Sequence, residues 1–562
     1  MLSLTQCNSS SGSTASSSTP PVPYCSTVTT YSSPAVITGS AEYEYRTNGN
    51  GAVATPKPIR HAEIRVTNSA GSLIQCSETD ASGNFSLNLP NDGSSATISI
   101  TSRADNTFVK AYILANPTQN TFHSISKSVT LDASKSVGTL TASATGTLEG
   151  GAFNILDKVL DSNDFLRTAT ANCQITFTNC IAFTIAPLVS IYWDKGVDPG
   201  SYFNLPPLSF FLPDRNELYI LGGVGGDIDN TDTDHFDDTI IIHEYGHFIE
   251  HNFSITDSPG GSHNGDNLLD PRLAWGEAWS NYFQAIVTGS SVYRDTYGTP
   301  LGTSGVYVNE NLESGTADTA TEADEGNFRE FSITRALVDL TDADEMNASD
   351  DLQTSFAEFW TIFAGTTGGF ADTSMNFRSI GLFYVLQNAL VGKSNWSTIQ
   401  TAEDHLALRT NYANTLSAGA ACPTVILAED VPGASPSNGP GRQPEDGSFV
   451  NSNQFKSNDF YQITHAGGAL NITMTYTTTP ANAANLDLFL YENEYSFGDT
   501  TTMSAASEDI NSIAASGDTE IISLGSLAAG TYLLNVHYDT ASGIRSAASY
   551  SLTVNATSVC PD

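Results

Sequence analysis

The sequence predicts a multidomain chain in which an α+β domain lies between two β-sandwiches. The chain has 562 residues, and at the usual domain size this length corresponds to about three to five domains. Both ends of the chain alternate apolar and polar residues over short runs, as half-buried strands do. The middle instead carries apolar residues at helical spacing.

The charge balance narrows the class of partner. The chain has 61 acidic and 22 basic residues and a net charge of -39, which repels a phosphate backbone and excludes nucleic acid as a partner. A protein in salty external water and an ordinary solvated surface both fit this acidity. No run approaches ~20 consecutive apolar residues, so we expect no transmembrane helix.

Residues 1–33 are expected to be a signal remnant followed by a tether. Cys7 follows Leu4 by three positions and precedes a Ser/Thr-rich run over residues 8–19. This arrangement resembles the end of a bacterial lipoprotein signal, although Gln6 stands where a small residue is usual. It predicts a lipid anchor through Cys7.

The seven cysteines indicate an exported protein, at the bacterial cell surface, in the outer membrane or outside the cell. Their positions suggest three disulfides and leave Cys7 over. Cys25 with Cys76 would tie the first domain to its leader, and Cys173 with Cys180 would close a short hairpin. Cys422 with Cys560 would join the two ends of the last domain.

Residues 34–147 form the first predicted β-sandwich. Phe85, Leu87 and Leu89 alternate with polar residues, and the turn before them contains the Asp and Gly that such turns favour. The run TDASGNFSLNLP ending at Pro90 resembles carboxypeptidase regulatory-like domains of the transthyretin-like type. The resemblance implies an accessory module without catalysis.

Residues 148–422 form the predicted central domain. A helix is expected over 153–167, strands over 181–193 and 217–221, and mostly helices thereafter. Residues 423–454 are rich in Pro, Gly, Ser and Asp and are expected to be a linker. Residues 455–562 contain only strand patterns, and their runs NLDLFLY, LAAGTYLLNV and SYSLTV resemble bacterial pre-peptidase C-terminal domains, which are β-sandwiches.

The segment that carries chemistry is His243-Glu-Tyr-Gly-His247. On a helix the two histidines lie one turn apart on the same face and can hold one Zn²⁺, with Glu244 beside them as general base. Glu250 and Phe253 exclude the metzincin continuation, which needs Gly and His there. Glu277, in the apolar helix LAWGEAWSNYF, is the predicted third ligand, and Asn281 lies one turn further to accept the outer N–H of a ligand histidine.

HEYGH followed by WGEAWSNYF resembles the gluzincin metallopeptidases, closest to the fungalysin-like and thermolysin-like groups. Asn281 replaces the acidic residue of that family. The resemblance implies one catalytic zinc on His243, His247 and Glu277, and hydrolysis of protein or peptide substrates. It also implies a strand that pairs with extended substrate, for which residues 217–221 are the candidate, an ordinary core strand being the equal alternative.

Other groups have less specific patterns. His263 is the first candidate for an oxyanion or substrate donor because it lies between the two zinc helices, and Arg329 and Arg335 are weaker candidates. Four aspartates at 227, 229, 232 and 234 alternate like Ca²⁺ ligands without forming an EF-hand, and a solvated acidic loop is the alternative. Asp295 begins a run that resembles the aspzincin third-ligand motif, but its spacing is one residue short.

The sequence therefore predicts a secreted or surface-anchored zinc endopeptidase. The alternative is a non-catalytic surface adhesin or binding scaffold with a degenerate protease domain. Glu244 favours the enzyme, because a scaffold needs no carboxylate there. No amine-anchoring GxMEN-like run is present, which favours an endopeptidase over an aminopeptidase.

Overall fold

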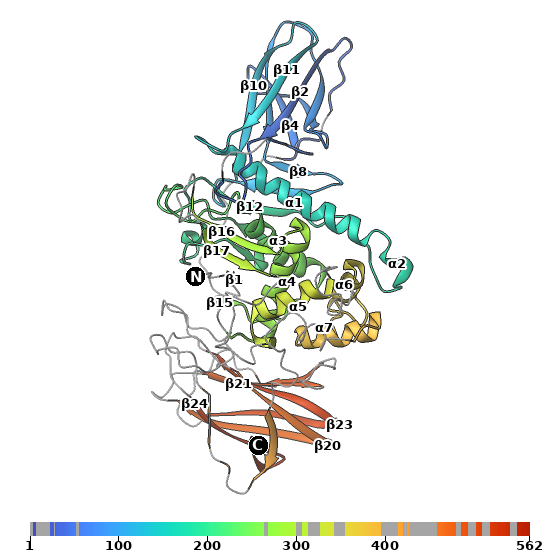
Figure 1. Ribbon diagram of the computed structural model, residues 1–562, viewed down its shortest axis with the longest axis vertical. Coiled ribbons are helices and arrows are strands. Elements are labelled where there is room, and N and C mark those ends of the chain that lie inside the picture. Colours follow the sequence, from blue (N-terminus) through green and yellow to red (C-terminus); the bar gives the residue numbers. More distant parts are fainter. Residues whose placement is uncertain are drawn as a thin grey trace.

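The computed structural model describes residues 4–6, 23–26, 28–51, 56–263, 268–298, 306–312, 326–341, 354–394, 414–419, 422, 424–427, 458–478, 485–492, 502–507, 518–539 and 548–561. An N-terminal β region, a mainly helical middle and a C-terminal β region follow one another along the long axis of the molecule (Figure 1). Cys7, the Ser/Thr-rich run and most of the predicted linker lie outside the described residues.

Two sheets form the N-terminal region. One has the strand order β10-β7-β4-β5 and the other the order β11-β2-β3, with β6 also paired to β2. Alternation in β6 buries Phe85, Leu87 and Leu89 and exposes the polar residues between them. The strands are β2 (Ala35–Tyr43), β3 (Lys57–Pro58), β4 (Glu63–Asn68), β5 (Leu73–Glu78), β6 (Asn84–Leu89), β7 (Ser95–Thr101), β10 (Ser124–Thr130) and β11 (Lys135–Ala142).

A five-stranded sheet connects this region to the middle of the molecule. Its order is β13-β14-β12-β9-β8, and β12 is parallel to both β9 and β14. Two of its strands come from within the predicted first sandwich, so the sheet crosses the boundary expected at residue 147. The strands are β8 (Arg103–Asp105), β9 (Lys110–Leu114), β12 (Val189–Tyr192), β13 (Phe210–Leu212) and β14 (Glu217–Tyr219).

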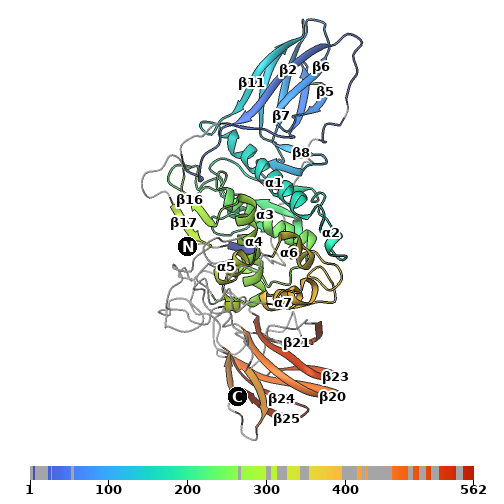
Figure 2. The ribbon, with the colours of Figure 1, turned by 45° about the vertical axis from the view of Figure 1, so that its right-hand side comes forward.

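Helices make up most of the middle region (Figure 2). The expected helix at 153–167 is longer, because α1 spans Glu149–Thr170. The others are α2 (Cys173–Thr176), α3 (Asp238–Phe253), α4 (Pro271–Thr288), α5 (Glu330–Thr341), α6 (Phe356–Phe363) and α7 (Ile380–Leu386). Among the described residues, none of these helices has the length and apolar character needed to cross a bilayer.

Short strands lie around these helices. β15 (Gly261–His263) pairs with the N-terminal strand β1 (Leu4–Gln6), and β16 (Val292–Thr296) pairs with β17 (Val306–Asn311). Both pairs are antiparallel. β15 and β16 flank α4 in the sequence, so they bring further side chains to the region where α3 and α4 meet.

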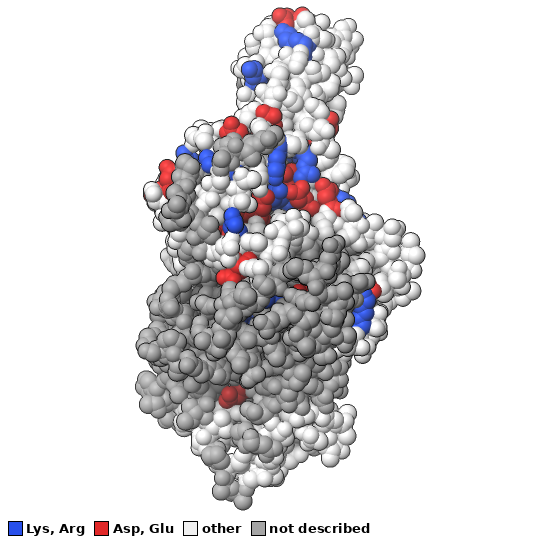
Figure 3. Space-filling view, viewed as in Figure 1, with Lys and Arg blue, Asp and Glu red and all other residues white. Residues whose placement is uncertain are grey.

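Charged side chains join the N-terminal region to α1 (Figure 3). One guanidinium nitrogen of Arg60 lies 2.5 Å from carboxylate oxygens of both Asp157 and Asp161. The ammonium of Lys158 lies 3.6 Å from Asp238, at the start of α3. These partly buried ion pairs connect the sandwich through α1 to α3.

The C-terminal region is one eight-stranded sheet, where we expected a two-layer sandwich. Pairing of β24 with both β25 and β20, and of β18 with both β25 and β20, closes part of the sheet on itself. Its first strand precedes the predicted linker and its second lies within it, so the sheet begins before residue 455. The strands are β18 (Asn414–Ala418), β19 (Val425–Leu427), β20 (Asn458–Thr478), β21 (Asn485–Glu492), β22 (Thr502–Ser507), β23 (Asp518–Asp539), β24 (Ala548–Val554) and β25 (Thr557–Pro561).

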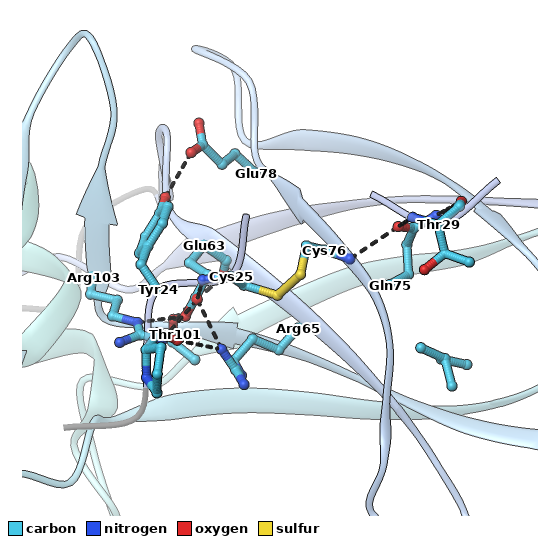
Figure 4. The surroundings of a disulfide bond; sticks show 12 residues. Tyr24, Cys25, Thr29, Glu63, Arg65, Gln75, Cys76, Glu78, Thr101 and Arg103 are labelled. Carbon is cyan, nitrogen blue, oxygen red and sulfur yellow. Dashed lines mark hydrogen bonds and ion pairs between the residues drawn. A yellow bond between two sulfur atoms is a disulfide. The ribbon is translucent and has the colours of Figure 1, made fainter. Parts of the chain in front are cut away.

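All three expected disulfides are confirmed, joining Cys25 to Cys76, Cys173 to Cys180 and Cys422 to Cys560. The loop between Cys173 and Cys180 contains the short helix α2 in place of the expected hairpin. Around the first disulfide, the Cys25 amide donates to Glu63, which also pairs with Arg103 at 2.6 Å (Figure 4). The leader is thus fixed covalently and through buried charges to the first region.

Candidate metal centre

Helix α3 carries the two histidines of the motif. His243 and His247 are buried, and their Nε2 atoms lie 3.2 Å apart. The isoleucines before His243 are also buried, so apolar packing fixes this helix inside the middle region. Both imidazoles therefore present one nitrogen each to the same point.

Helix α4 lies close against α3. Gly246 permits this approach, because a Cβ there would come within 3.1 Å of the Ser280 Cα. The Trp279 indole N–H donates to the Gly246 carbonyl at 2.9 Å. Asp270 caps the start of α4 by accepting from the Arg272 amide. These contacts hold Glu277 opposite the two histidines.

Glu277 completes a triangle of ligand atoms. Its Oε2 lies 3.3 Å from the Nε2 of His243 and 3.3 Å from the Nε2 of His247. Atoms that bind one Zn²⁺ at 2.0–2.2 Å in tetrahedral geometry lie about 3.3–3.5 Å apart. The three residues therefore fit one zinc ion.

The outer nitrogens of both histidines have partners. His243 Nδ1 lies 2.9 Å from Asn281 Oδ1, and His247 Nδ1 lies 3.0 Å from the Ser280 hydroxyl. An N–H at each Nδ1 leaves a lone pair on each Nε2 directed at Glu277. Three electron-pair donors that converge in a buried site repel one another unless a metal ion or a proton lies between them.

Glu244 lies beside this triangle on the same helix. It is buried, and it accepts a hydrogen bond from the Phe211 amide of β13. Burial raises the pKa of Glu244 to about 7, while His243 lowers it and Glu277 raises it. A carboxylate with a pKa near neutrality is suited to general base chemistry.

His263 lies on β15 next to the third ligand. Its Nε2 is 3.5 Å from Glu277 Oε1 and 3.5 Å from Glu330 Oε2. Burial lowers the pKa of His263, but the two carboxylates hold it well above its ordinary value. The sequence did not indicate Glu330, the first residue of α5, because no local pattern relates it to the zinc helices.

The two arginine donor candidates are both buried. Arg335 is buried; burial lowers its pKa to about 10, and Glu310 and Asp339 raise it. Asp339 was its expected ion-pair partner. Arg329 is also buried.

The expected substrate strand is not at the edge of its sheet. Residues 217–219 form β14, which pairs with β12 on one side and β13 on the other. The core-strand alternative is therefore the one that the structure supports for β14. Among the described strands, the edge on this side is β13, whose Phe211 amide contacts Glu244.

The four aspartates before α3 divide into two pairs. Asp232 and Asp234 join Asp295 of β16 in a cluster whose carboxylate oxygens lie within 4.8 Å of one another. Asp227 and Asp229 are not part of this cluster, and Asp227 instead accepts hydrogen bonds within its own turn. The structure therefore does not bring all four residues together as one set of ligands.

Comparisons with known proteins bear on the middle of the chain. Residues 179–379 match the family model described as the mycolysin C-terminal domain. No curated protein matches the chain significantly.

Two solved structures show weak likeness. The pre-peptidase C-terminal domain of a collagenase from Bacillus anthracis is 14% identical, with a TM-score of 0.16, and the alignment covers 26% of this chain and 100% of that domain. A cycloisomaltooligosaccharide glucanotransferase from Paenibacillus is 10% identical, with a TM-score of 0.12, covering 93% of this chain and 72% of that one. Scores this low assign no fold.

The region matched by the family model contains both α3 and α4. It spans His243, Glu244, His247 and Glu277, which the fold brings together in one buried cluster. This match supports a protein of the zinc metallopeptidase type.

Proposed function

We propose that this protein is a secreted or surface-anchored zinc endopeptidase. The observation that carries the proposal is the convergence of two imidazole nitrogens and one carboxylate oxygen at 3.2–3.3 Å, with Glu244 on the same helix. His243, His247 and Glu277 would hold the zinc. The metal-binding geometry and the carboxylate base are together what peptide hydrolysis by an activated water requires.

Zinc bound to these residues would lower the pKa of its water and polarise the scissile carbonyl. Glu244 takes the proton of the attacking water and delivers it to the leaving amine. Burial and the Phe211 amide hold its carboxylate in place. Asn281 and Ser280 orient the histidines through their outer nitrogens.

His263 is our candidate for the donor that stabilises the oxyanion. Its Nε2 lies 3.5 Å from the ligand carboxylate, on the side of the site that faces Glu330. The edge strand β13 is the candidate for pairing with an extended substrate, because its amide at Phe211 already reaches the base. With His263 as the donor and β13 as the pairing strand, an extended substrate would lie across the metal site.

The three disulfides favour an oxidising location outside the cytoplasm. We propose an extracellular or outer-membrane location, with lipid attachment at Cys7 as the means of anchoring. Labelling of cells with a radioactive fatty acid should mark the wild type and leave Cys7→Ala unlabelled.

The decisive experiment measures zinc content and cleavage of casein and of a quenched peptide blocked at both ends. The wild type should contain about one zinc and cleave both substrates. Glu244→Gln should keep its zinc and lose activity by about 10²–10⁴-fold, because only the proton transfer is removed. His247→Ala should lose both zinc and activity.

Glu250→Gln is the matched control. This glutamate is buried on the same helix, and its pKa is raised to about 8, so glutamine resembles its neutral form. We expect its activity near pH 7 to be close to that of the wild type. Zinc-loaded wild type without cleavage of either substrate would contradict the proposed endopeptidase.

A further inference from the structure

A second triangle of ligand atoms shares Glu277 with the first. It consists of His263, Glu277 and Glu330, and one ligand atom from each residue lies within 4.8 Å of the others. The Nε2 atom of His263 lies 3.5 Å from Glu277 Oε1 and 3.5 Å from Glu330 Oε2. All three side chains are fully buried. They come from β15, α4 and α5, so the tertiary fold alone brings them together.

The ligand atoms of this triangle have no hydrogen-bond partner in the part of the chain that the structure describes. This holds for both oxygens of Glu277, both oxygens of Glu330 and the Nε2 atom of His263. The Nδ1 atom of His263 lies 3.1 Å from the Gly261 carbonyl oxygen, so an N–H at Nδ1 donates to that oxygen.

A proton on Nε2 does not satisfy this group. One N–H can bond to only one of the two carboxylates, and 3.5 Å is longer than the usual hydrogen bond to either of them. Two buried carboxylates that share one proton at this distance remain poorly compensated. A divalent cation between the three side chains would compensate both.

The distances fit a second zinc ion. Atoms that bind one Zn²⁺ at 2.0–2.2 Å in tetrahedral geometry lie about 3.3–3.5 Å apart, and Nε2 lies 3.5 Å from each carboxylate oxygen. Glu277 contributes Oε2 to the first triangle and Oε1 to the second. A carboxylate that binds one ion through each oxygen suits a pair of metal ions about 3.5–4 Å apart, as in two-metal sites.

We propose that His263, Glu277 and Glu330 bind a second Zn²⁺, with Glu277 bridging the two ions. The inference rests on the proposed zinc site but not on peptide cleavage. The imidazole favours zinc over Ca²⁺ and Mg²⁺, which prefer oxygen ligands. The second site has one imidazole where the first has two, and it shares its carboxylate. It is therefore the weaker site, empty when zinc is scarce and filled when zinc is abundant.

The second ion changes the role of His263. While the ion is bound, Nε2 is a ligand and cannot donate to an oxyanion. The centre therefore has two states, one with a single zinc and His263 as the donor, the other with two zinc ions bridged by Glu277. The free zinc concentration decides between them.

The test measures zinc binding by the full chain in equilibrium dialysis with radioactive zinc, at low free zinc and then in excess. The wild type should bind one zinc at low concentration and two in excess. Glu330→Gln and His263→Ala should keep the first zinc, which also shows that they fold. Both should bind the second at least about 100-fold more weakly, because loss of an outer partner alone costs about 10–100-fold.

Glu250→Gln is the control for loss of a buried glutamate. Glu250 lies on α3 and belongs to neither triangle. This variant should bind two zinc ions as the wild type does.

Substitution with Co²⁺ tests the bridge. Two Co²⁺ ions joined by one carboxylate couple magnetically, so the EPR signal per cobalt should fall when the second ion binds to the wild type. It should not fall in Glu330→Gln. An unchanged signal per cobalt in the wild type with two ions bound would show that Glu277 does not bridge them.

A single zinc in the wild type in excess zinc, or a second zinc held equally by the wild type and both cluster variants, would overturn the proposal. Absence of any zinc would overturn both this proposal and the proposed function. Two zinc ions without peptide cleavage would support this proposal and contradict only the endopeptidase.

Discussion

Asn281 determines how firmly His243 is oriented. Its side-chain oxygen accepts from His243 Nδ1 at 2.9 Å inside a fully buried site. Asn281→Ala should weaken zinc affinity about 10–100-fold, because the imidazole loses its fixed orientation. Asn281→Asp should keep or improve the affinity. Competition with a chromophoric chelator measures both, and equal affinity in Asn281→Ala would refute this role.

Glu250 gives a prediction for stability against pH. Burial raises its pKa to about 8 in the folded chain, against 4.5 as the ordinary value, so the folded state holds a proton that the unfolded state releases between these pH values. Its stabilising contribution is complete below about pH 4.5 and is lost as pH rises through about 8, with a slope of at most about 1.4 kcal/mol per pH unit.

Glu250→Gln should remove this part of the pH dependence and leave the variant more stable than the wild type near pH 8. Urea unfolding at pH 5.5, 7 and 8.5 tests it. If the free energies of unfolding of the two proteins changed in parallel with pH, this would show that Glu250 is ionised in the folded state.

Residue patterns predicted some members of the site and missed others for clear reasons. The spacing of His243 and His247 follows from one helical turn, and Asn281 follows Glu277 by the same rule. Ser280 follows Glu277 by three positions, so the same rule allowed it to be found. Glu330 reaches His263 only through the tertiary fold, and no local pattern carries that contact.

At the scale of elements, the periodicity of apolar residues predicted where helices and strands lie along the chain. It did not predict which elements pair or pack with one another. The run at 217–221 contains the strand β14, at 217–219. The position of β14 inside the sheet depends on β13, a strand of only three residues that the turn-forming residues around it conceal in the sequence. Likewise, the only motif that the sequence suggests at Asp295 has the wrong spacing, whereas β16 brings this residue to the aspartates before α3.

The close approach of α3 and α4 gives a prediction at this scale. A methyl group at Gly246 would meet the Ser280 backbone at 3.1 Å, so α4 and Glu277 would have to move. Gly246→Ala should therefore lower zinc affinity and cost about 1–3 kcal/mol by overpacking, more than the ~1 kcal/mol gained in helix propensity.

Gly276→Ala is the matched control on the facing helix. Its methyl group would meet only the end of the Glu250 side chain at 3.3 Å, which can turn aside. Chelator competition measures zinc affinity, and urea unfolding measures the free energy of unfolding. In both quantities Gly276→Ala should be closer to the wild type than Gly246→Ala is. The reverse order would show that the helix spacing does not control Glu277.

For the whole molecule, the spacing of apolar residues predicted the order of the three regions along the chain but not the boundaries between them. Strand patterns do not reveal which strands pair across long distances, and here β9 pairs with β12 across the helix α1. At the other end, β18 pairs with β20 and β25 across the predicted linker. Phe377 also packs against Phe460 and Tyr491, which joins the middle and C-terminal regions.

These pairings predict that the N-terminal region is not a removable accessory. A chain shortened to residues 148–562 would lose β8 and β9, leave β12 unpaired on one side, and strip α1 of Arg60. It should be insoluble or bind no zinc. Arg60→Met in the full chain should remain folded and keep zinc, but unfold about 1–3 kcal/mol more easily, since partly buried carboxylates lose their partner. Urea unfolding and zinc analysis measure both, and a soluble 148–562 chain with full zinc would show that the sandwich folds independently of the metal centre.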